Sequence, residues 1–142
     1  NITASLIQKI KKNAPKIEVI YKGYLTHKSA IALMKSGDLL LNFIFKGADR
    51  DMISGKLLEY LASEVPVLSI GNPKSEAGRL LDECSLAQMI DSKNSIAIQK
   101  FIGLMIQKKD NAKNQWEGIE RWSRENITAA LNDILEQGKS AR

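Results

Sequence analysis

The stretch from Met52 to Gly78, MISGKLLEYLASEVPVLSIGNPKSEAG, contains a helix, a strand and the start of a second helix in close succession. Leucines and an alanine repeat at helical spacing over residues 54–63, and they form the core face of an amphipathic helix. The run PVLSI at 66–70 predicts a strand, and the longer apolar run DLLLNFIF at 38–45 is typical of a strand covered on both faces. Residues 75–83 then return to a helical pattern, so this stretch predicts a layered α/β fold.

The same alternation extends in both directions along the chain. Upstream we predict helices over 2–10 and 26–37, strands over 17–23 and 38–45, and a loop over 45–53. Downstream we predict a strand over 86–90, a helix over 95–108, and two helical pieces over 116–124 and 127–137. Strands separated by helices of about ten residues pair in parallel through right-handed crossovers. We therefore expect a Rossmann-like, three-layer α/β domain with a parallel sheet, ending in C-terminal helices.

The chain length of 142 residues predicts one domain that spans residues 1–142. Domains of this class usually begin with a strand, whereas this sequence begins at Asn1 with a helical pattern. We therefore expect the chain to be a portion of a longer protein that lacks at least one upstream strand of its own sheet.

The composition is 44% hydrophobic and 26% charged, which is ordinary for a globular domain and argues against disorder. Its apolar runs are far shorter than the roughly 20 residues of a membrane-spanning helix. The sequence shows no positively charged leader ahead of an apolar segment. The single cysteine, Cys84, cannot form an internal disulfide. We therefore expect a cytoplasmic location. The net charge of +5 is diffuse; it suits a phosphorylated ligand and does not indicate nucleic acid.

Ligands of open parallel sheets bind beyond the carboxyl ends of the strands, where helices begin. Four segments qualify here: GYLTH at 23–27, KGADRDMISGK at 46–56, GNPKSE at 71–76 and DSKN at 91–94. The second is the most specific. Ser54 and Gly55 let the backbone approach a ligand closely, the helix start favours an anion, and Lys56 adds a positive charge. This segment predicts a diphosphate-binding site.

Lys56 and Glu59 share one side of the predicted helix, together with Ser63. Glu59 lies about one turn behind the start of the helix, where its carboxylate can accept hydrogen bonds from two sugar hydroxyls. The alternative is an exposed Lys56–Glu59 pair worth a few tenths of a kcal/mol. Spacing alone leaves both interpretations open.

Three quoted segments, GYLTHKSAIALMKSGDLLLNF, SGKLLEYLASEVPVLSIG and EAGRLL, carry a resemblance to a known family. The chain resembles the C-terminal, donor-binding half of glycosyltransferases of the group 1 superfamily (family 4, GT-B fold), over about residues 17–135. The resemblance implies a glycosyltransferase that moves a sugar, with retention, from a nucleoside diphosphate sugar to a glycan, lipid or small-molecule acceptor. It also implies that the N-terminal domain of the same protein supplies the acceptor site, so this chain alone should be inactive.

The resemblance further implies roles for individual residues. Glu59 matches the second glutamate of the family's Glu-x7-Glu motif, which binds the ribose, and Asp51 stands where the first glutamate contacts the donor sugar. Ser54, Gly55 and Lys56 would meet the diphosphate or the donor sugar; the motif's glycine is displaced by one position here. Tyr24 and His27 would flank the nucleotide base. No metal and no cofactor are implied, and His27 is the only histidine.

The expected partners are the nucleotide-sugar donor and the missing N-terminal domain. Apolar surface on the C-terminal helices predicts self-association of the fragment, and the resemblance allows peripheral association of the full-length enzyme with the inner face of a membrane. Two other functions stay open at this point. One is a nucleotide-sugar 2-epimerase on the same scaffold, and the other is a non-catalytic α/β interaction module such as a receiver-like domain.

Overall fold

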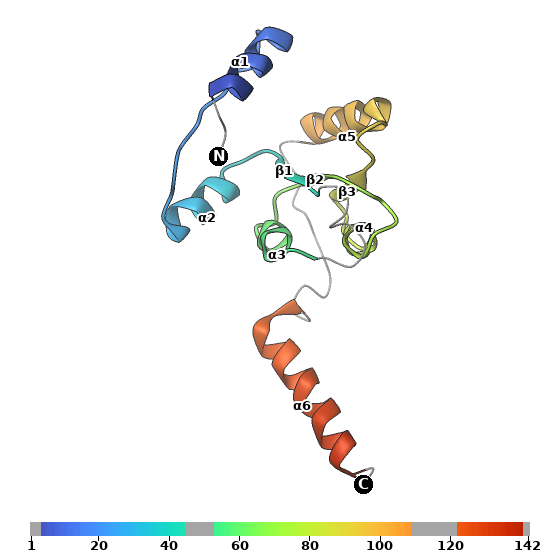
Figure 1. The fold of residues 1–142 in the computed structure, drawn as a ribbon. Coiled ribbons are helices and arrows are strands. Elements are labelled where there is room, and N and C mark those ends of the chain that lie inside the picture. Colours follow the sequence, from blue (N-terminus) through green and yellow to red (C-terminus); the bar gives the residue numbers. More distant parts are fainter. Residues whose placement is uncertain (1–3, 45–52, 109–121, 141–142) are drawn as a thin grey trace. The chain divides into compact units, whose positions relative to one another are not determined.

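The structure is a computed structural model that describes residues 4–44, 53–108 and 122–140. The chain divides into two compact units, Asn1–Ala30 and Ile31–Arg142, and each is described by itself. Figure 1 shows the elements along the chain. The larger unit contains the sheet and the candidate site.

The sheet of the larger unit has three described strands, all parallel: β1 (Leu40–Phe43), β2 (Val67–Ile70) and β3 (Ala87–Ile90). Their spatial order is β1-β2-β3, with Leu40 paired to Val67 and Val67 paired to Ala87. Helix α3 (Gly55–Ala62) joins β1 to β2, and α4 (Glu76–Asp82) joins β2 to β3. This arrangement confirms the predicted α/β fold with a parallel sheet.

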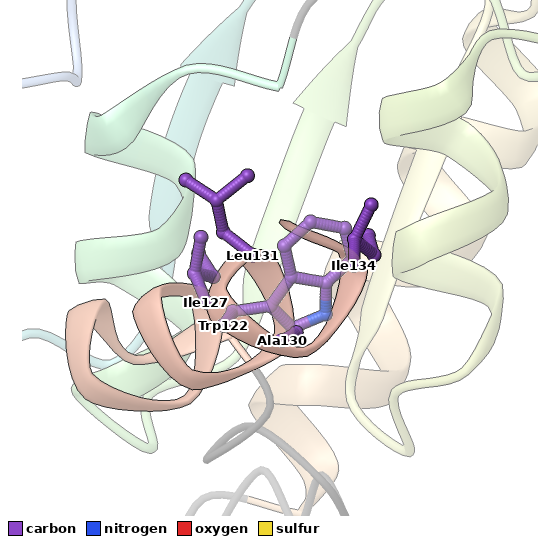
Figure 2. A pocket seen from close by; sticks show the side chains of 5 residues that line it. All are labelled: Trp122, Ile127, Ala130, Leu131 and Ile134. Atoms are coloured by element: carbon purple, nitrogen blue, oxygen red, sulfur yellow. The ribbon is translucent and has the colours of Figure 1, made fainter. Parts of the chain in front are cut away.

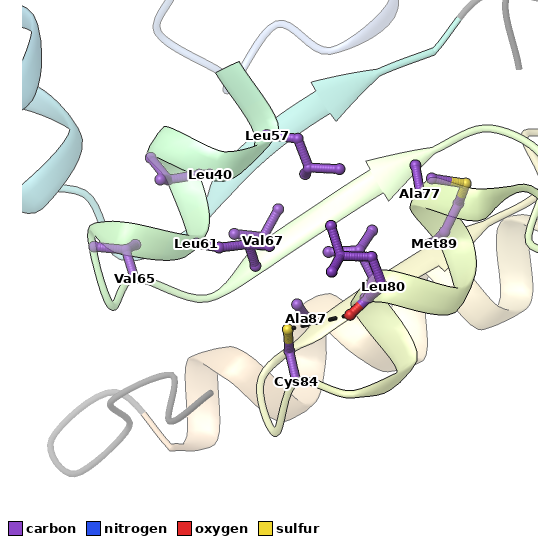
Figure 3. Packing of buried hydrophobic residues seen from close by; sticks show 11 residues of the cluster. Leu40, Leu57, Leu61, Val65, Val67, Ala77, Leu80, Cys84, Ala87 and Met89 are labelled. Carbon is purple, nitrogen blue, oxygen red and sulfur yellow. Dashed lines mark hydrogen bonds between the residues drawn. The ribbon is translucent and has the colours of Figure 1, made fainter. Parts of the chain in front are cut away.

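Helices lie on both faces of the sheet, as expected for strands that are mainly apolar. On one face, α3 and α4 pack against the strands in a cluster that includes Leu57, Leu61, Val67, Leu81 and Met89 (Figure 3). On the other face, α5 (Ser95–Gln107) packs Phe101 and Met105 against Leu68 and Ile90. The result is three layers, with α3 and α4 on one side and α5 on the other (Figure 1).

The smaller unit contains α1 (Ala4–Asn13) and the first residues of α2 (His27–Lys35). α1 ends shortly before Pro15, as predicted. The predicted strand at 17–23 is wrong, since the structure assigns no strand to these residues. Alternating apolar residues indicate only that one side of a segment suits burial, and a strand also needs a hydrogen-bonded neighbour. Ile17, Ile20 and Tyr21 are exposed.

β1 is only partly covered on the face that α5 shields elsewhere. Leu41 is paired with Leu68, yet Leu41 is 49% exposed whereas Leu68 is 1% exposed. Phe43, two residues along the same face, is 61% exposed. In the part of the chain that the structure describes, no strand borders the outer edge of β1.

The last described element is α6 (Arg124–Ser140), which extends the predicted helical piece at 127–137 in both directions. Most of the other predicted piece, 116–124, lies outside the described residues. Trp122 precedes α6 and packs, partly buried, against the cluster beneath α3 and α4. Within the described ranges, we find no helix with the length and apolar character needed to span a bilayer.

Candidate functional site

The carboxyl ends of the three strands lie at one edge of the sheet, and a capped helix follows each of them. Ser54, Ser75 and Asn94 are the N-caps of α3, α4 and α5. Each cap side chain accepts a hydrogen bond from the amide three residues later, at Leu57, Gly78 and Ala97 respectively. This capping fixes the start of each helix beside the carboxyl edge of the sheet.

The start of α3 is open to an approaching ligand. Ser54 has extended backbone angles, φ −76° and ψ 144°, and its Oγ accepts from Leu57 N at 3.2 Å. The amides of Gly55 and Lys56 occupy the first helical positions, where backbone N–H groups have no partner within the helix. A Cβ built on Gly55 would meet no atom of the described chain within 4 Å. Contacts with the described residues therefore give no reason for a glycine here, and the open backbone suits close approach of a ligand.

Lys56 does not form the ion pair with Glu59 that the spacing allowed. Its ammonium lies over the ring of Tyr60, 5.8 Å from the ring centroid. An ion pair of this kind does form between Arg79 and Glu76 on α4. The Lys56–Tyr60 contact is a cation–π interaction at i, i+4 spacing. Lys56 is therefore not the ion-pair partner of the exposed Glu59 carboxylate.

Lys56 and Glu59 thus present two separate charges on the first two turns of α3. The positive pole of the helix and the Lys56 ammonium favour an anion near the helix start. The Glu59 carboxylate is an acceptor-only group and suits hydroxyl donors. Together these groups can bind a ligand that carries phosphate at one end and hydroxyls at the other.

The connections after β2 and β3 repeat one hydrogen-bonding pattern. In the first, Asn72 Oδ1 accepts from Lys74 N at 3.0 Å and Asn72 O accepts from Ser75 N at 3.0 Å. In the second, Asp91 Oδ1 accepts from Lys93 N at 2.8 Å, and Asp91 O accepts from Asn94 N at 2.9 Å. Each is an Asx turn that holds a lysine immediately before a helix cap.

Lys74 and Lys93 lie in two of the four segments predicted to border a ligand, but neither lysine was assigned a role from the sequence. The signal that could have revealed them is the shared order of an Asx residue, one intervening residue, a lysine and a capping residue. It occurs as NPKS at 72–75 and as DSKN at 91–94.

Buried polar contacts between neighbouring elements stabilise the carboxyl edge of the sheet. Asn42 Nδ2 donates to Ser69 Oγ at 2.9 Å, and the two residues are 7% and 0% exposed. Ser75 Oγ also lies 3.5 Å from Met89 Sδ, as a weak donor to it. Such contacts between adjacent elements fix the positions of the strand ends and of the α4 cap.

The remaining predicted site residues do not belong to α3. Tyr24 is fully exposed in the smaller unit, and His27 is the first residue of α2. Asp51 and most of the predicted 45–53 loop lie outside the described residues. Ser54, Gly55, Lys56 and Glu59 are therefore the predicted site residues that the structure places on one element.

α6 carries an apolar surface of a different kind. Figure 2 shows the Trp122 indole among Ile127, Leu131 and Ile134, with Ala130 beside them. This hollow is almost entirely apolar and offers no group for acid–base or phosphate chemistry. It suits packing against another apolar surface.

Cys84 is buried at the end of α4, where its thiol faces Leu80 O at 3.5 Å. Burial and then the neighbouring Glu83 carboxylate raise the pKa of Cys84 to about 11. A thiol with a raised pKa is a poor nucleophile at neutral pH. We therefore assign Cys84 to packing.

In the described ranges no group of three His, Cys, Asp or Glu side chains is arranged to hold a metal ion. Comparison of the chain with protein-family profiles, with curated proteins and with solved structures found no match. The resemblance to group 1 glycosyltransferases stays a prediction, and the assignment of function depends on the geometry of the carboxyl edge.

Proposed function

We propose that this chain is the donor-binding half of a glycosyltransferase and binds a nucleoside diphosphate sugar at the carboxyl edge of its sheet. The observation that carries the proposal is the start of α3, where an open glycine backbone and Lys56 precede the separate carboxylate of Glu59. An anion-favouring helix start one turn ahead of a hydroxyl acceptor matches a diphosphate joined to a ribose.

In this proposal the amides of Gly55 and Lys56 contact the diphosphate, and Glu59 accepts hydrogen bonds from the ribose hydroxyls. When the sugar is transferred, negative charge grows on the departing nucleoside diphosphate. A fixed positive pole stabilises that charge as it develops, without reorganisation. The chain would supply this half of the reaction, and the acceptor side would come from an N-terminal domain of the same protein, in the cytoplasm or at the inner face of a membrane.

The experiment is a ligand-observed NMR screen of the chain against uridine, guanosine and adenosine diphosphates and their sugars, because it needs no acceptor. We expect one nucleotide series to bind, and we expect weaker binding of the bare nucleoside. A second measurement tests for sugar transfer by the isolated chain. Turnover on any acceptor would contradict the division of the active site between two domains.

A non-catalytic interaction module is the second candidate, and the exposed apolar surface of α6 favours it. Partners of such a module would bind through apolar side chains such as Ile127, Leu131 and Ile134. The same NMR screen separates the two candidates, since absence of binding by every nucleotide would favour the module.

A further inference from the structure

Lys74 and Lys93 lie in the connections that follow two adjacent strands. These two connections lead to helices on opposite faces of the sheet. β2 and β3 are adjacent and parallel, with Ile70 paired to Ile90. The connection after β2 leads to α4 on one face, and the connection after β3 leads to α5 on the other face. In parallel sheets, ligands bind outside the carboxyl ends of the strands, at a point where neighbouring connections lead to opposite faces.

The backbones of both lysines are held in place while their side chains remain exposed. Each lysine amide donates to an Asx side chain two residues earlier, at 3.0 Å for Lys74 and 2.8 Å for Lys93. Among the described residues, neither ammonium is paired with a carboxylate within 4.0 Å. Two exposed lysine side chains, with no carboxylate partner in the described part of the chain, therefore lie at this edge.

Two carboxylates also lie at this edge. Asp91 accepts the amide of Lys93 and keeps its negative charge, whereas Glu76 is paired with Arg79 on the exposed side of α4. Lys74 and Lys93 therefore outnumber the remaining carboxylate, and these side chains leave a net positive charge at the edge.

We propose that Lys74 and Lys93 bind phosphate groups of an anionic ligand between the β2–α4 and β3–α5 connections. The inference rests on the proposed function only for the identity of that ligand, which would be the nucleoside diphosphate sugar. The binding itself needs two cations on opposite sides of one sheet edge, and any small polyphosphate carries enough charge to engage both. Lysine suits this role as a compact, strongly hydrated point charge.

The test measures binding of tripolyphosphate to the chain by isothermal titration at low and high salt. Replacing both lysines, Lys74→Ala/Lys93→Ala, should lower the affinity roughly tenfold at low ionic strength, or about threefold per exposed cation. The loss should shrink at about 0.5 M salt, where the Debye length falls to a few ångströms. The double arginine variant, Lys74→Arg/Lys93→Arg, keeps both charges and should retain most of the affinity.

The matched control is Lys108→Ala, which removes an exposed lysine from the other end of α5. Its affinity for tripolyphosphate should stay within about twofold of the parent chain. Equal losses in the control and in the double alanine variant, or no measurable tripolyphosphate binding by the parent chain, would overturn the inference.

Titration with nucleoside diphosphate sugars separates this inference from the proposed function. Lysine-dependent binding of tripolyphosphate without binding of any nucleotide sugar would uphold the lysine site and contradict the proposed function. Binding of a nucleotide sugar that is unchanged in the double alanine variant would uphold the proposed function and overturn the lysine site. Circular dichroism and thermal melting of each variant confirm that the fold is retained.

Discussion

The backbone of Gly78 lies directly against the carbonyl group of Pro73, so that a Cβ at Gly78 would overlap the carbonyl carbon and oxygen. Gly78 is in α4, and Pro73 is in the connection that carries Lys74. α4 and this connection thus pack so closely that position 78 has no room for a side chain. This contact holds the connection after β2 close to the first turn of α4.

Gly78→Ala should destabilise the chain by about 2 kcal/mol, because the added methyl group displaces backbone that cannot easily move. Urea denaturation monitored by circular dichroism measures this loss. Gly103→Ala on α5 is the matched control, since a Cβ there meets no described atom within 4 Å. It should raise the free energy of unfolding by about 0.5–1 kcal/mol through helix propensity. Equal effects at the two glycines would refute the close-contact explanation.

Lys56 and Glu59 should affect different parts of a bound nucleotide. Lys56→Ala should weaken a nucleoside diphosphate much more than the bare nucleoside, whereas Glu59→Ala should weaken both by a similar factor of about ten. Glu59→Gln retains an acceptor and should lose less. Isothermal titration of each variant with nucleoside and nucleoside diphosphate measures the difference. If all affinities stayed within twofold in correctly folded variants, the donor site would have to be sought at another connection.

The buried Asn42–Ser69 hydrogen bond should contribute to stability. Ser69→Ala removes the acceptor of Asn42 Nδ2, and loss of a buried partner costs about 1–3 kcal/mol. Chemical denaturation of Ser69→Ala, Asn42→Ala and the double variant forms a cycle. We expect the double variant to lose less than the sum of the two single losses; strict additivity would show that the two side chains are not coupled.

The raised pKa of Cys84 predicts that the folded chain loses stability at alkaline pH. Its pKa is raised from 9.0 to about 11 in the folded chain, so the unfolded chain loses the thiol proton first as the pH rises. The contribution of the protonated thiol is complete below pH 9 and is lost as the pH rises from 9 through 11. Lysines and tyrosines also titrate there, so the informative quantity is the difference between the parent chain and Cys84→Ala. A difference that stayed constant from pH 8 to 11 would contradict the raised pKa.

The sequence is sufficient to predict the sheet because strands covered by helices are mainly apolar. The strands around Leu40, Leu68 and Met89 each contain a single polar residue, and each is followed by a helix with a capping residue. Residues 17–23 show an alternating pattern in place of a mainly apolar run. Their alternating pattern describes one side of a segment, while strand formation depends on a neighbour that the pattern does not specify.

The candidate site was predictable to the extent that it lies on one helix. Helical spacing places Lys56 near both Glu59 and Tyr60, and spacing cannot decide which of them the ammonium contacts. Lys74 and Lys93 are far apart in the sequence, and they lie at one edge of the sheet because they follow adjacent parallel strands. That relationship is a property of the three-dimensional topology.

In the described part of the chain, no strand borders the outer edge of β1, and this open edge affects how the chain refolds. Natural sheets usually blunt an open edge with charge, proline or a bulge, yet LLNF at 40–43 contains neither charge nor proline. With Leu41 and Phe43 exposed beside it, this edge offers a template for another chain to add a strand. Recovery from denaturant should therefore fall as protein concentration rises, because intermolecular strand addition competes with intramolecular folding.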